Sequence, residues 1–406
     1  MKLKKVPCEC LDFVEAVHRH SVYPLMYCHL KILGHLNHDK LRQAVYRSSK
    51  VVPEILYAYD FHKNVFVHLG YTPDDVIKYM DISKLAASLR RDLSCCPQLQ
   101  ILITRKENYE RVVIIMSHLL ADGNGFLQYL YLLASLYNGD LRDMNFKNRR
   151  DISPLLDNIC VLPSTEQTKT HKHCFMSPLR QKKKGNLLLC LTSQLSNDEM
   201  ESIHQKAARS GVTLNDVFMT AYARVIARHE NLKAVVLPCP ADLRRFFPEQ
   251  DDLTVANMTG MYERITVEDP CSHEFTSVLQ QVHIEMALQK SRCRCFWGIR
   301  PLDKIFPYIP HSITGFVIKA VYGRMPVSYT NFGRIDHEKF LFKDCSIQDC
   351  FLTGTYRMAP DFQLTVSSFK NIFTLNCTLI GTKYDKILGQ WILDQVKHEI
   401  LEWTKE

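Results

Sequence analysis

The sequence predicts a protein of the α/β (α+β) class, with mixed α and β layers and two subdomains. Segments with the two-residue period of strands and segments with the period of helices follow one another in irregular order, which favours mixed or antiparallel sheets. The chain has 406 residues, more than one simple core usually holds, so two domains or subdomains are expected. A polar, basic stretch near the middle separates two regions of regular apolar pattern.

The N-terminal third of the chain predicts a sheet with helices beside it. Apolar and polar residues alternate over 26–32, which indicates a strand with one buried face. A capped helix follows over 37–53. The apolar runs at 99–104 and 111–116 flank a short polar turn, so they predict an antiparallel pair. An apolar helix is predicted next, over 126–137.

The second half of the chain carries clearer helix signals. Ser196 and Glu199 form a capping box that opens one helix. A second box, from Thr213 to Asp216, opens a helix with a wide apolar stripe. A short buried strand is expected at 234–237. The remaining predicted elements are a hairpin and a final amphipathic helix, over 362–369, 372–379 and 387–401.

The polar stretch at 163–186 divides the chain. It is rich in lysine, threonine and histidine and has no apolar period, which is typical of a connecting segment. We therefore predict an N-terminal subdomain over 1–165, a linker over 166–186 and a C-terminal subdomain over 187–406.

The composition excludes several classes of function. The net charge of +8 is small for this length and mostly scattered, which argues against nucleic-acid binding. No apolar run is long enough to span a membrane, and the N-terminus lacks the apolar core of a secretory signal. The 15 cysteines include no Cys-x-x-Cys pair. We expect a cytoplasmic protein with reduced thiols and no metal site, the alternative ligands being the two Cys-x-Cys pairs and His171, His173 and Cys174.

A histidine follows the most apolar predicted strand. The run from Val112 to Met116 consists of five apolar residues, four of them branched at Cβ, and is typical of a buried strand. His118 comes just past its end, and Asp122 and Gly123 follow. Catalytic groups collect in loops at strand ends, and histidine is suited to accept a proton near neutral pH. His118 is therefore a candidate general base.

Residues 118–123 resemble the His-x-x-x-Asp-Gly motif of the chloramphenicol-acetyltransferase-like acyltransferases, a superfamily that includes peptide-synthetase condensation domains, wax-ester synthases and alcohol acetyltransferases. Four more segments resemble motifs of that superfamily in the same order. They are a helix start at 211–217, an Asp-Leu-Arg segment at 240–245, an Asn-x-x-Gly at 257–260 and a Ser/Thr-Asn-x-Gly strand at 328–333. The resemblance spans nearly the whole chain.

Two departures narrow the resemblance. Ser117 stands where condensation domains often carry a first histidine, and the family's base is the second one. Residues 331–334 read Asn-Phe-Gly-Arg in a place comparable to the late Asp-Phe-Gly-Trp-Gly motif of plant acyltransferases. The departures favour a subgroup that resembles alcohol acetyltransferases or wax-ester synthases.

The resemblance implies two chloramphenicol-acetyltransferase-like α/β sandwich subdomains with mixed sheets flanking a central tunnel. His118 would act near its middle as the general base. Asp122 is a second candidate catalytic residue. In the family, the carboxylate at this position of the motif shapes the loop by pairing with an arginine. Arg244 is the candidate partner, and Gly123 permits tight backbone geometry before the helix.

The resemblance also implies oxyanion donors on the strand at 328–333. Asn331 and Ser328 are the candidates, and ordinary sheet hydrogen bonding is the alternative role for both. Arg244, Arg245 and Arg334 are candidates for contact with coenzyme A phosphates or are solvated charges. No cofactor-binding residue is otherwise identified.

The predicted function is an acyl-CoA-dependent O- or N-acyltransferase. No cofactor is expected to stay bound, because acyl-CoA is a co-substrate. The expected partners are an acyl thioester donor and a small alcohol or amine acceptor. Two alternatives remain: a freestanding condensation-type enzyme that takes its acyl group from a carrier protein, and a catalytically silent binding protein of the same fold.

Overall fold

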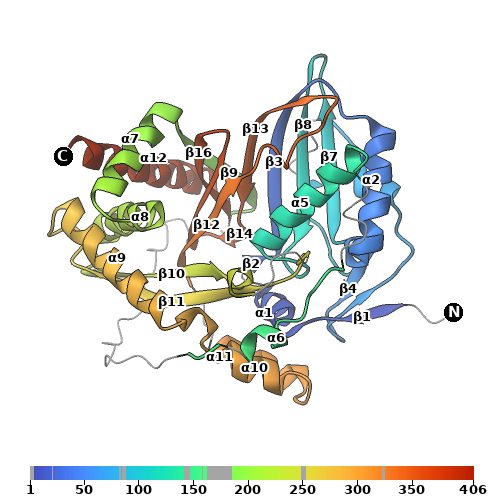
Figure 1. Ribbon diagram of the computed structural model, residues 1–406, viewed down its shortest axis with the longest axis horizontal. Coiled ribbons are helices and arrows are strands. Elements are labelled where there is room, and N and C mark those ends of the chain that lie inside the picture. The colour runs from blue at the N-terminus through green and yellow to red at the C-terminus, as the bar shows by residue number, and fades with distance from the viewer. Residues whose placement is uncertain are drawn as a thin grey trace.

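In the computed structural model, the two largest sheets lie side by side and helices surround them (Figure 1). The structure describes residues 4–406 apart from 21, 82–83, 85–87, 141–146, 158, 162–184, 248–252 and 322–324. Most of the predicted linker and the possible ligands at 171–174 lie outside the described residues.

The first sheet has five strands in the order β13-β3-β8-β7-β6. Its strands are β13 (Ser346–Thr353), β3 (Leu25–Leu33), β8 (Tyr109–Ser117), β7 (Leu99–Arg105) and β6 (Ile77–Tyr79). The predicted antiparallel pair is confirmed as β7 and β8. The helices α2 (His38–Val51) and α5 (Gly123–Tyr137) pack against each other beside this sheet (Figure 1). The helix α5 begins three residues earlier than the predicted start at 126. The side chain of Asp122 caps it by accepting a hydrogen bond from the backbone N–H of Gly125.

The second sheet follows the order β12-β15-β16-β14-β2, and β9 also pairs with β16. Its strands are β12 (Val327–Ile335), β15 (Phe362–Phe369), β16 (Ile372–Gly381), β14 (Tyr356–Met358), β2 (Val22–Tyr23) and β9 (Leu187–Leu195). The predicted hairpin is confirmed as β15 and β16. The helices α7 (Asn197–Arg209), α8 (Leu214–Glu230) and α12 (Lys383–Lys405) pack together beside this sheet. Both predicted capping boxes are present, at the starts of α7 and α8.

The two sheets exchange strands. The chain leaves β2 in the second sheet and enters β3 in the first one residue later, at Pro24. It returns from β13 to β14 through Gly354 and Thr355. One strand of each predicted subdomain therefore pairs within the sheet of the other. The predicted boundaries themselves stay a prediction, since 162–184 is not described.

A two-stranded ribbon and several shorter elements complete the fold. The ribbon pairs β10 (Ala234–Asp242) with β11 (Thr259–Glu268). The strand β10 is longer than predicted, and it contains Pro238 and Pro240, which a strand with one partner accommodates. The small sheet holds β1 (Lys5–Pro7), β5 (Val65–Val67) and β4 (Ala58–Asp60). The remaining helices are α1 (Cys10–His18), α3 (Pro73–Val76), α6 (Ser153–Leu156), α9 (Phe275–Ser291), α10 (Ile299–Ile305) and α11 (His311–Val321), with short 3-10 turns at Pro53–Leu56, Leu243–Phe246 and Arg294–Phe296.

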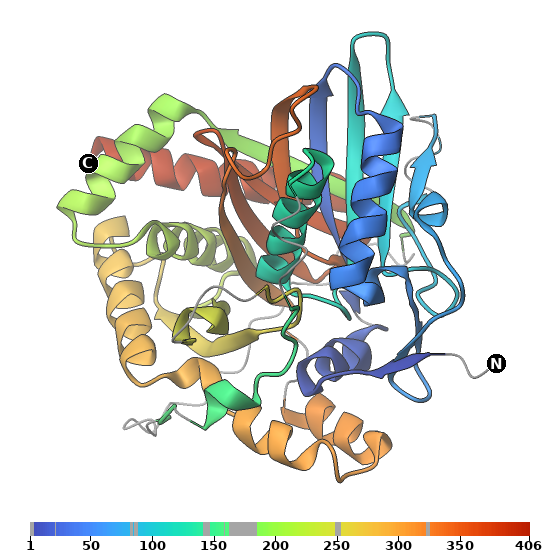
Figure 2. The ribbon, with the colours of Figure 1, turned by 45° about the vertical axis from the view of Figure 1, so that its right-hand side comes forward.

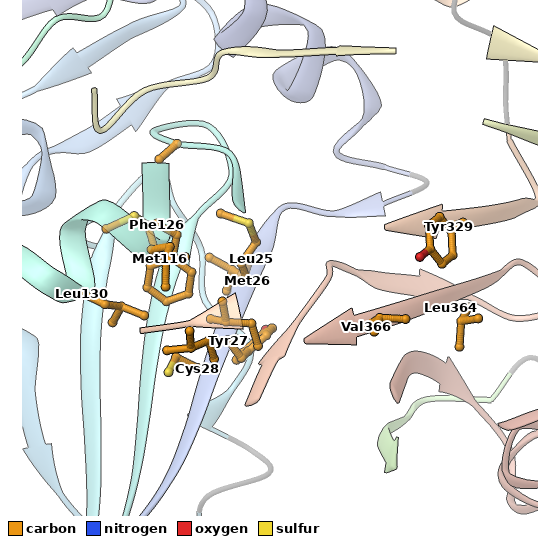
Figure 3. Close-up of a cluster of buried hydrophobic side chains, with 14 of the residues drawn as sticks. Leu25, Met26, Tyr27, Cys28, Met116, Phe126, Leu130, Tyr329, Leu364 and Val366 are labelled. Atoms are coloured by element: carbon orange, nitrogen blue, oxygen red, sulfur yellow. The ribbon is translucent and has the colours of Figure 1, made fainter. Parts of the chain in front are cut away.

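The buried apolar side chains hold each sheet to its helices. Figure 3 shows Met116, Phe126 and Leu130 grouped beside β3, while Leu364 and Val366 lie at the second sheet. Each is nearly inaccessible to solvent, and burying a side chain of this size stabilises the fold by roughly 1.5–3 kcal/mol. Figure 2 shows α10 and α11 next to α1 at one end of the molecule, and α1 contacts α11.

Candidate functional site

A cavity of about 250 Å³ lies where the two sheets exchange strands. Its wall includes Glu15 from α1, His118 from the loop after β8, Thr330 from β12, and Thr355 and Arg357 from the crossing between β13 and β14. Both halves of the fold therefore contribute polar side chains to one cavity. Much of the remaining wall is apolar and includes Leu11, Val14, Met26, Trp297 and Ile299.

His118 is held in the cavity wall by its own backbone. Its N–H donates to the carbonyl oxygen of Pro24 at 2.9 Å, at the first strand crossing. Its carbonyl oxygen accepts a hydrogen bond of 2.9 Å from Nδ2 of Asn257. The side chain is 22% exposed and lines the cavity. The backbone contacts fix the loop, so the imidazole can meet a ligand without rearrangement of the strand.

Glu15 faces the imidazole. Its Oε2 atom lies 3.8 Å from Nδ1 of His118. That Nδ1 atom is buried and has no hydrogen-bond partner among the described residues. A carboxylate at this position can pair with an imidazolium, as in catalytic sites that use a histidine base. No sequence motif pointed to Glu15, because its position opposite His118 arises only when α1 packs against the cavity.

Asp122 does not act from the cavity as a free acid, because it is buried and fully engaged. Its Oδ1 atom lies 3.0 Å from Nη2 of Arg244, and its Oδ2 atom accepts 3.1 Å from Nη1 of the same residue. Oδ2 also accepts from the N–H of Met258 at 2.6 Å and the hydroxyl of Thr259 at 2.8 Å. The two residues that the resemblance paired are thus in contact, and they join α5 to the β10–β11 ribbon.

Burial and pairing act in opposite directions on Asp122. Burial disfavours the charged carboxylate and is the largest single influence on its pKa. The charge and hydrogen bonds of Arg244, together with the N–H groups of Gly125 and Met258, outweigh it and hold the pKa below its usual range. Asp122 is therefore ionised at neutral pH. This carboxylate is suited to positioning the His118 loop rather than to moving a proton.

A second buried network holds the same loop from the other side. Asp12 of α1 accepts 2.8 Å from Nδ2 of Asn257 and 2.5 Å from Nη2 of Arg150. Nη1 of Arg150 donates 2.9 Å to the carbonyl oxygen of Leu120. Asn257 thus links Asp12 to the carbonyl of His118. Sequence reasoning placed Asn257 in a motif and missed Asp12 and Arg150, which lie far apart in the chain.

The strand β12 presents only alternate side chains to the cavity. Thr330 and Phe332 line it, whereas neither candidate donor does. Ser328 is 4% exposed, and its Oγ atom has no hydrogen-bond partner among the described residues. Asn331 points to the other face, where its Oδ1 atom accepts 2.8 Å from the N–H of Gly333. Of Ser328, Thr330 and Asn331, only Thr330 lies within the wall.

Gly123 marks a close approach between the two halves. A Cβ atom there would lie 2.2 Å from Cε1 of Phe332. Glycine at the start of α5 therefore lets β12 approach the loop that carries His118. Arg245 lies in the 3-10 turn after β10, beside the ring of Phe246, with 4.8 Å between Cζ and the ring centroid. Arg334 is exposed near the end of β12.

Two further features bear on the class of site. No helix within the described ranges combines the length and the apolar character needed to cross a membrane. In the same part of the chain, no three histidine, cysteine, aspartate or glutamate side chains gather as a metal site would require.

Comparison with known proteins rests on structure alone. No protein-family model and no curated sequence matches the chain. Among solved structures, polyketide synthase associated protein 5 from Mycobacterium tuberculosis is similar at 13% identity and a TM-score of 0.68, over 99% of both chains. The condensation domain of the Monacolin K polyketide synthase is similar at 10% identity and a TM-score of 0.69, over 100% of this chain and 99% of that domain.

The trichothecene 15-O-acetyltransferase of Fusarium sporotrichioides is similar at 12% identity and a TM-score of 0.70, over 98% of this chain and 94% of that enzyme. At such low identities these likenesses establish the fold. The likeness spans nearly the full length of the chain. The chain therefore has the fold of the condensation-domain and chloramphenicol-acetyltransferase-like superfamily.

Proposed function

We propose that the protein transfers an acyl group from a thioester to a hydroxyl or amine, with His118 as the general base. The observation that carries the proposal is the imidazole of His118 in the wall of the cavity, with Glu15 opposite Nδ1. The fold supports it, because the similar structures include an acetyltransferase and condensation domains.

The chemistry follows from this placement. Nε2 of His118 accepts the proton of the acceptor hydroxyl or amine as its oxygen or nitrogen attacks the thioester carbonyl carbon. The resulting tetrahedral oxyanion collapses, the carbon–sulfur bond breaks, and the departing thiolate takes the proton back from Nε2. Glu15 stabilises the imidazolium between the two proton transfers. Positioned proton transfer of this kind contributes about two to four orders of magnitude in rate.

We assign the side-chain stabilisation of the oxyanion to Thr330. Its hydroxyl lines the same cavity as His118 and belongs to the strand on which the donor was expected. Ser328 and Asn331 remain the weaker candidates, since neither lines that wall. Asp122 and Arg244 act as positioning residues, because their contacts hold the loop that carries His118.

The proposed donor is acyl-CoA. A wall that is largely apolar, with Val14, Met26 and Trp297 among its residues, suits an acyl chain. The test incubates the purified protein with acyl-CoA thioesters of increasing length and a set of alcohols and amines. Released thiol is measured together with the mass of the acylated acceptor. We expect both products in equal amounts.

Other outcomes separate the alternatives. Turnover of the same acyl group only when it is attached to a carrier protein would identify a condensation-type enzyme. Binding of thioesters without release of thiol, under every combination of donor and acceptor, would support the silent binding protein and contradict the proposal.

A further inference from the structure

Besides its histidines, the cavity wall includes Arg357, whose side chain has no hydrogen-bond or ion-pair partner among the described residues. It lies on β14, two residues past Thr355, where the chain has just crossed from the first sheet to the second. It lines the same cavity as His118. The mechanism proposed above does not use it, and no sequence motif pointed to it.

The guanidinium of Arg357 is unsatisfied. It forms no ion pair and no side-chain hydrogen bond with any residue in the described ranges, and its Nε atom is buried without a partner. Arginine carries five N–H donors, and a buried charged group without partners is costly. Native structures rarely leave such a group unpaired unless water, an ion or a ligand completes it.

Arg244 provides the comparison within the same chain. Its side chain is buried, and all of its nitrogens donate, to Asp122, Asp242, Thr254 and the carbonyl of Ala256. An arginine with a purely structural role is thus fully satisfied here. Arg357 differs from it in lining the cavity while its Nε atom is buried without a partner among the described residues.

The charges around Arg357 leave it only partly neutralised. Burial lowers its pKa, and the carboxylates of Glu15 and Asp361 act in the opposite direction from beyond ion-pair distance. Glu15 also faces His118. Because an arginine stays protonated in proteins, the cavity holds a permanent positive charge. A planar guanidinium matches a carboxylate with two parallel hydrogen bonds.

We propose that Arg357 binds an acidic group of the substrate, of the carboxylate class, while His118 acts on the reacting end. The inference rests on the proposed acyl transfer and narrows its substrate class. The carboxylate can belong to the acyl group, as in a dicarboxylic thioester, or to the acceptor, as in a hydroxy acid. Gln363 and Thr355 line the same wall and supply further polar atoms.

The experiment compares matched pairs of substrates that differ in the carboxylate. Succinyl-CoA against butyryl-CoA tests the acyl group, and lactate against lactamide tests the acceptor. Both kcat/KM, from thiol release, and Kd, from calorimetry, are measured for each member. We expect the carboxylate member to be favoured by about tenfold or more in one pair, since hydrogen bonds between charged groups are stronger than those between neutral groups.

Variants of Arg357 test whether this residue causes the preference for the carboxylate substrate. Arg357→Met removes the charge at similar length and should abolish the preference in the same pair. Arg357→Lys retains the positive charge but lacks the planar, bidentate donors of the guanidinium, so it should keep part of the preference. Arg209→Met, which removes an exposed arginine on α7, should leave the ratio as in the wild type. Melting temperatures identify any variant that fails to fold, and Arg357→Lys then carries the comparison.

Two failures are distinguishable. If thiol release depends on His118 but neither pair shows a carboxylate preference, or Arg357→Met keeps the preference, the inference about Arg357 is wrong and the acyl transfer stands. If no thioester is consumed, the proposed function is wrong, and the inference about substrate class falls with it. A preference in Kd that Arg357→Met removes, without turnover, would then indicate only a carboxylate-binding protein.

Discussion

The Nδ1 atom of His118 lies 3.8 Å from the Oε2 atom of Glu15. One residue follows a central strand and the other belongs to α1, so tertiary packing alone brings them together. In the proposed mechanism this carboxylate lies opposite the imidazolium that general-base catalysis creates. Glu15 therefore connects the packing of α1 to the chemistry of the cavity.

Glu15→Gln should lower kcat by about tenfold or more, because the charged imidazole loses its carboxylate. The change should appear mainly in kcat rather than in KM, since Glu15 acts on the base. Steady-state thiol release measures both. Glu201→Gln, on the exposed face of α7, is the matched control. Equal loss of kcat in Glu15→Asp and Glu15→Gln would indicate a packing role instead.

Asp122→Asn should destabilise the fold by about 3–5 kcal/mol, because it removes the more deeply buried of the two carboxylates, Asp122 and Asp242, that pair with the buried guanidinium of Arg244. Urea unfolding at neutral pH measures the difference in free energy of unfolding. Asp394→Asn, an exposed substitution on α12, should change that free energy little. A stable Asp122→Asn variant with normal activity would show that the loop does not need the ion pair.

Glu9, the residue that precedes α1, makes the free energy of unfolding depend on pH. Burial, followed by the charge of Asp12, raises its pKa from 4.5 to about 7. The folded state therefore binds a proton more tightly than the unfolded state. Its contribution to stability is fully present below pH 4.5 and is lost as the pH rises through about 7.

Glu9→Gln should remove this dependence, and the variant should gain stability relative to the wild type above pH 7. Thermal unfolding at a series of pH values between those limits measures the effect. Parallel curves for the variant and the wild type would mean that Glu9 titrates normally in the folded protein.

Thr330→Val should lower kcat by about 10²–10³, the usual effect of losing one oxyanion donor. The substitution keeps the shape of the side chain on β12, so binding of the thioester should change little. Ser328→Ala is the informative comparison, because Ser328 lies on the same strand outside the cavity wall. A larger loss in Ser328→Ala than in Thr330→Val would reverse the assignment.

The sequence predicted those features that depend on local pattern. The capping boxes at Ser196 and Thr213 and the hairpin of β15 and β16 are confirmed, since each signal is complete within a short segment. The loop at 118–123 was also identified, because an apolar strand precedes it and its motif is continuous.

The remaining part of the site depends on contacts between distant segments. Asp12, Glu15 and Arg150 carry no motif, and they reach the loop only after α1 and the segment at 147–157 pack against it. Arg357 lies in a three-residue strand whose partners, β16 and β2, come from both ends of the chain. Its exposure to the cavity follows from the strand crossing, which no local period reveals.

The central claim is that His118 moves the proton in acyl transfer. The most direct measurement is kcat for thiol release by His118→Ala, with the best donor and acceptor of the wild type. The control is His398→Ala, which removes an exposed histidine on α12. We predict a loss of about 10²–10⁴ in His118→Ala, an unchanged melting temperature and normal activity in His398→Ala. Full activity in a folded His118→Ala protein would contradict the account.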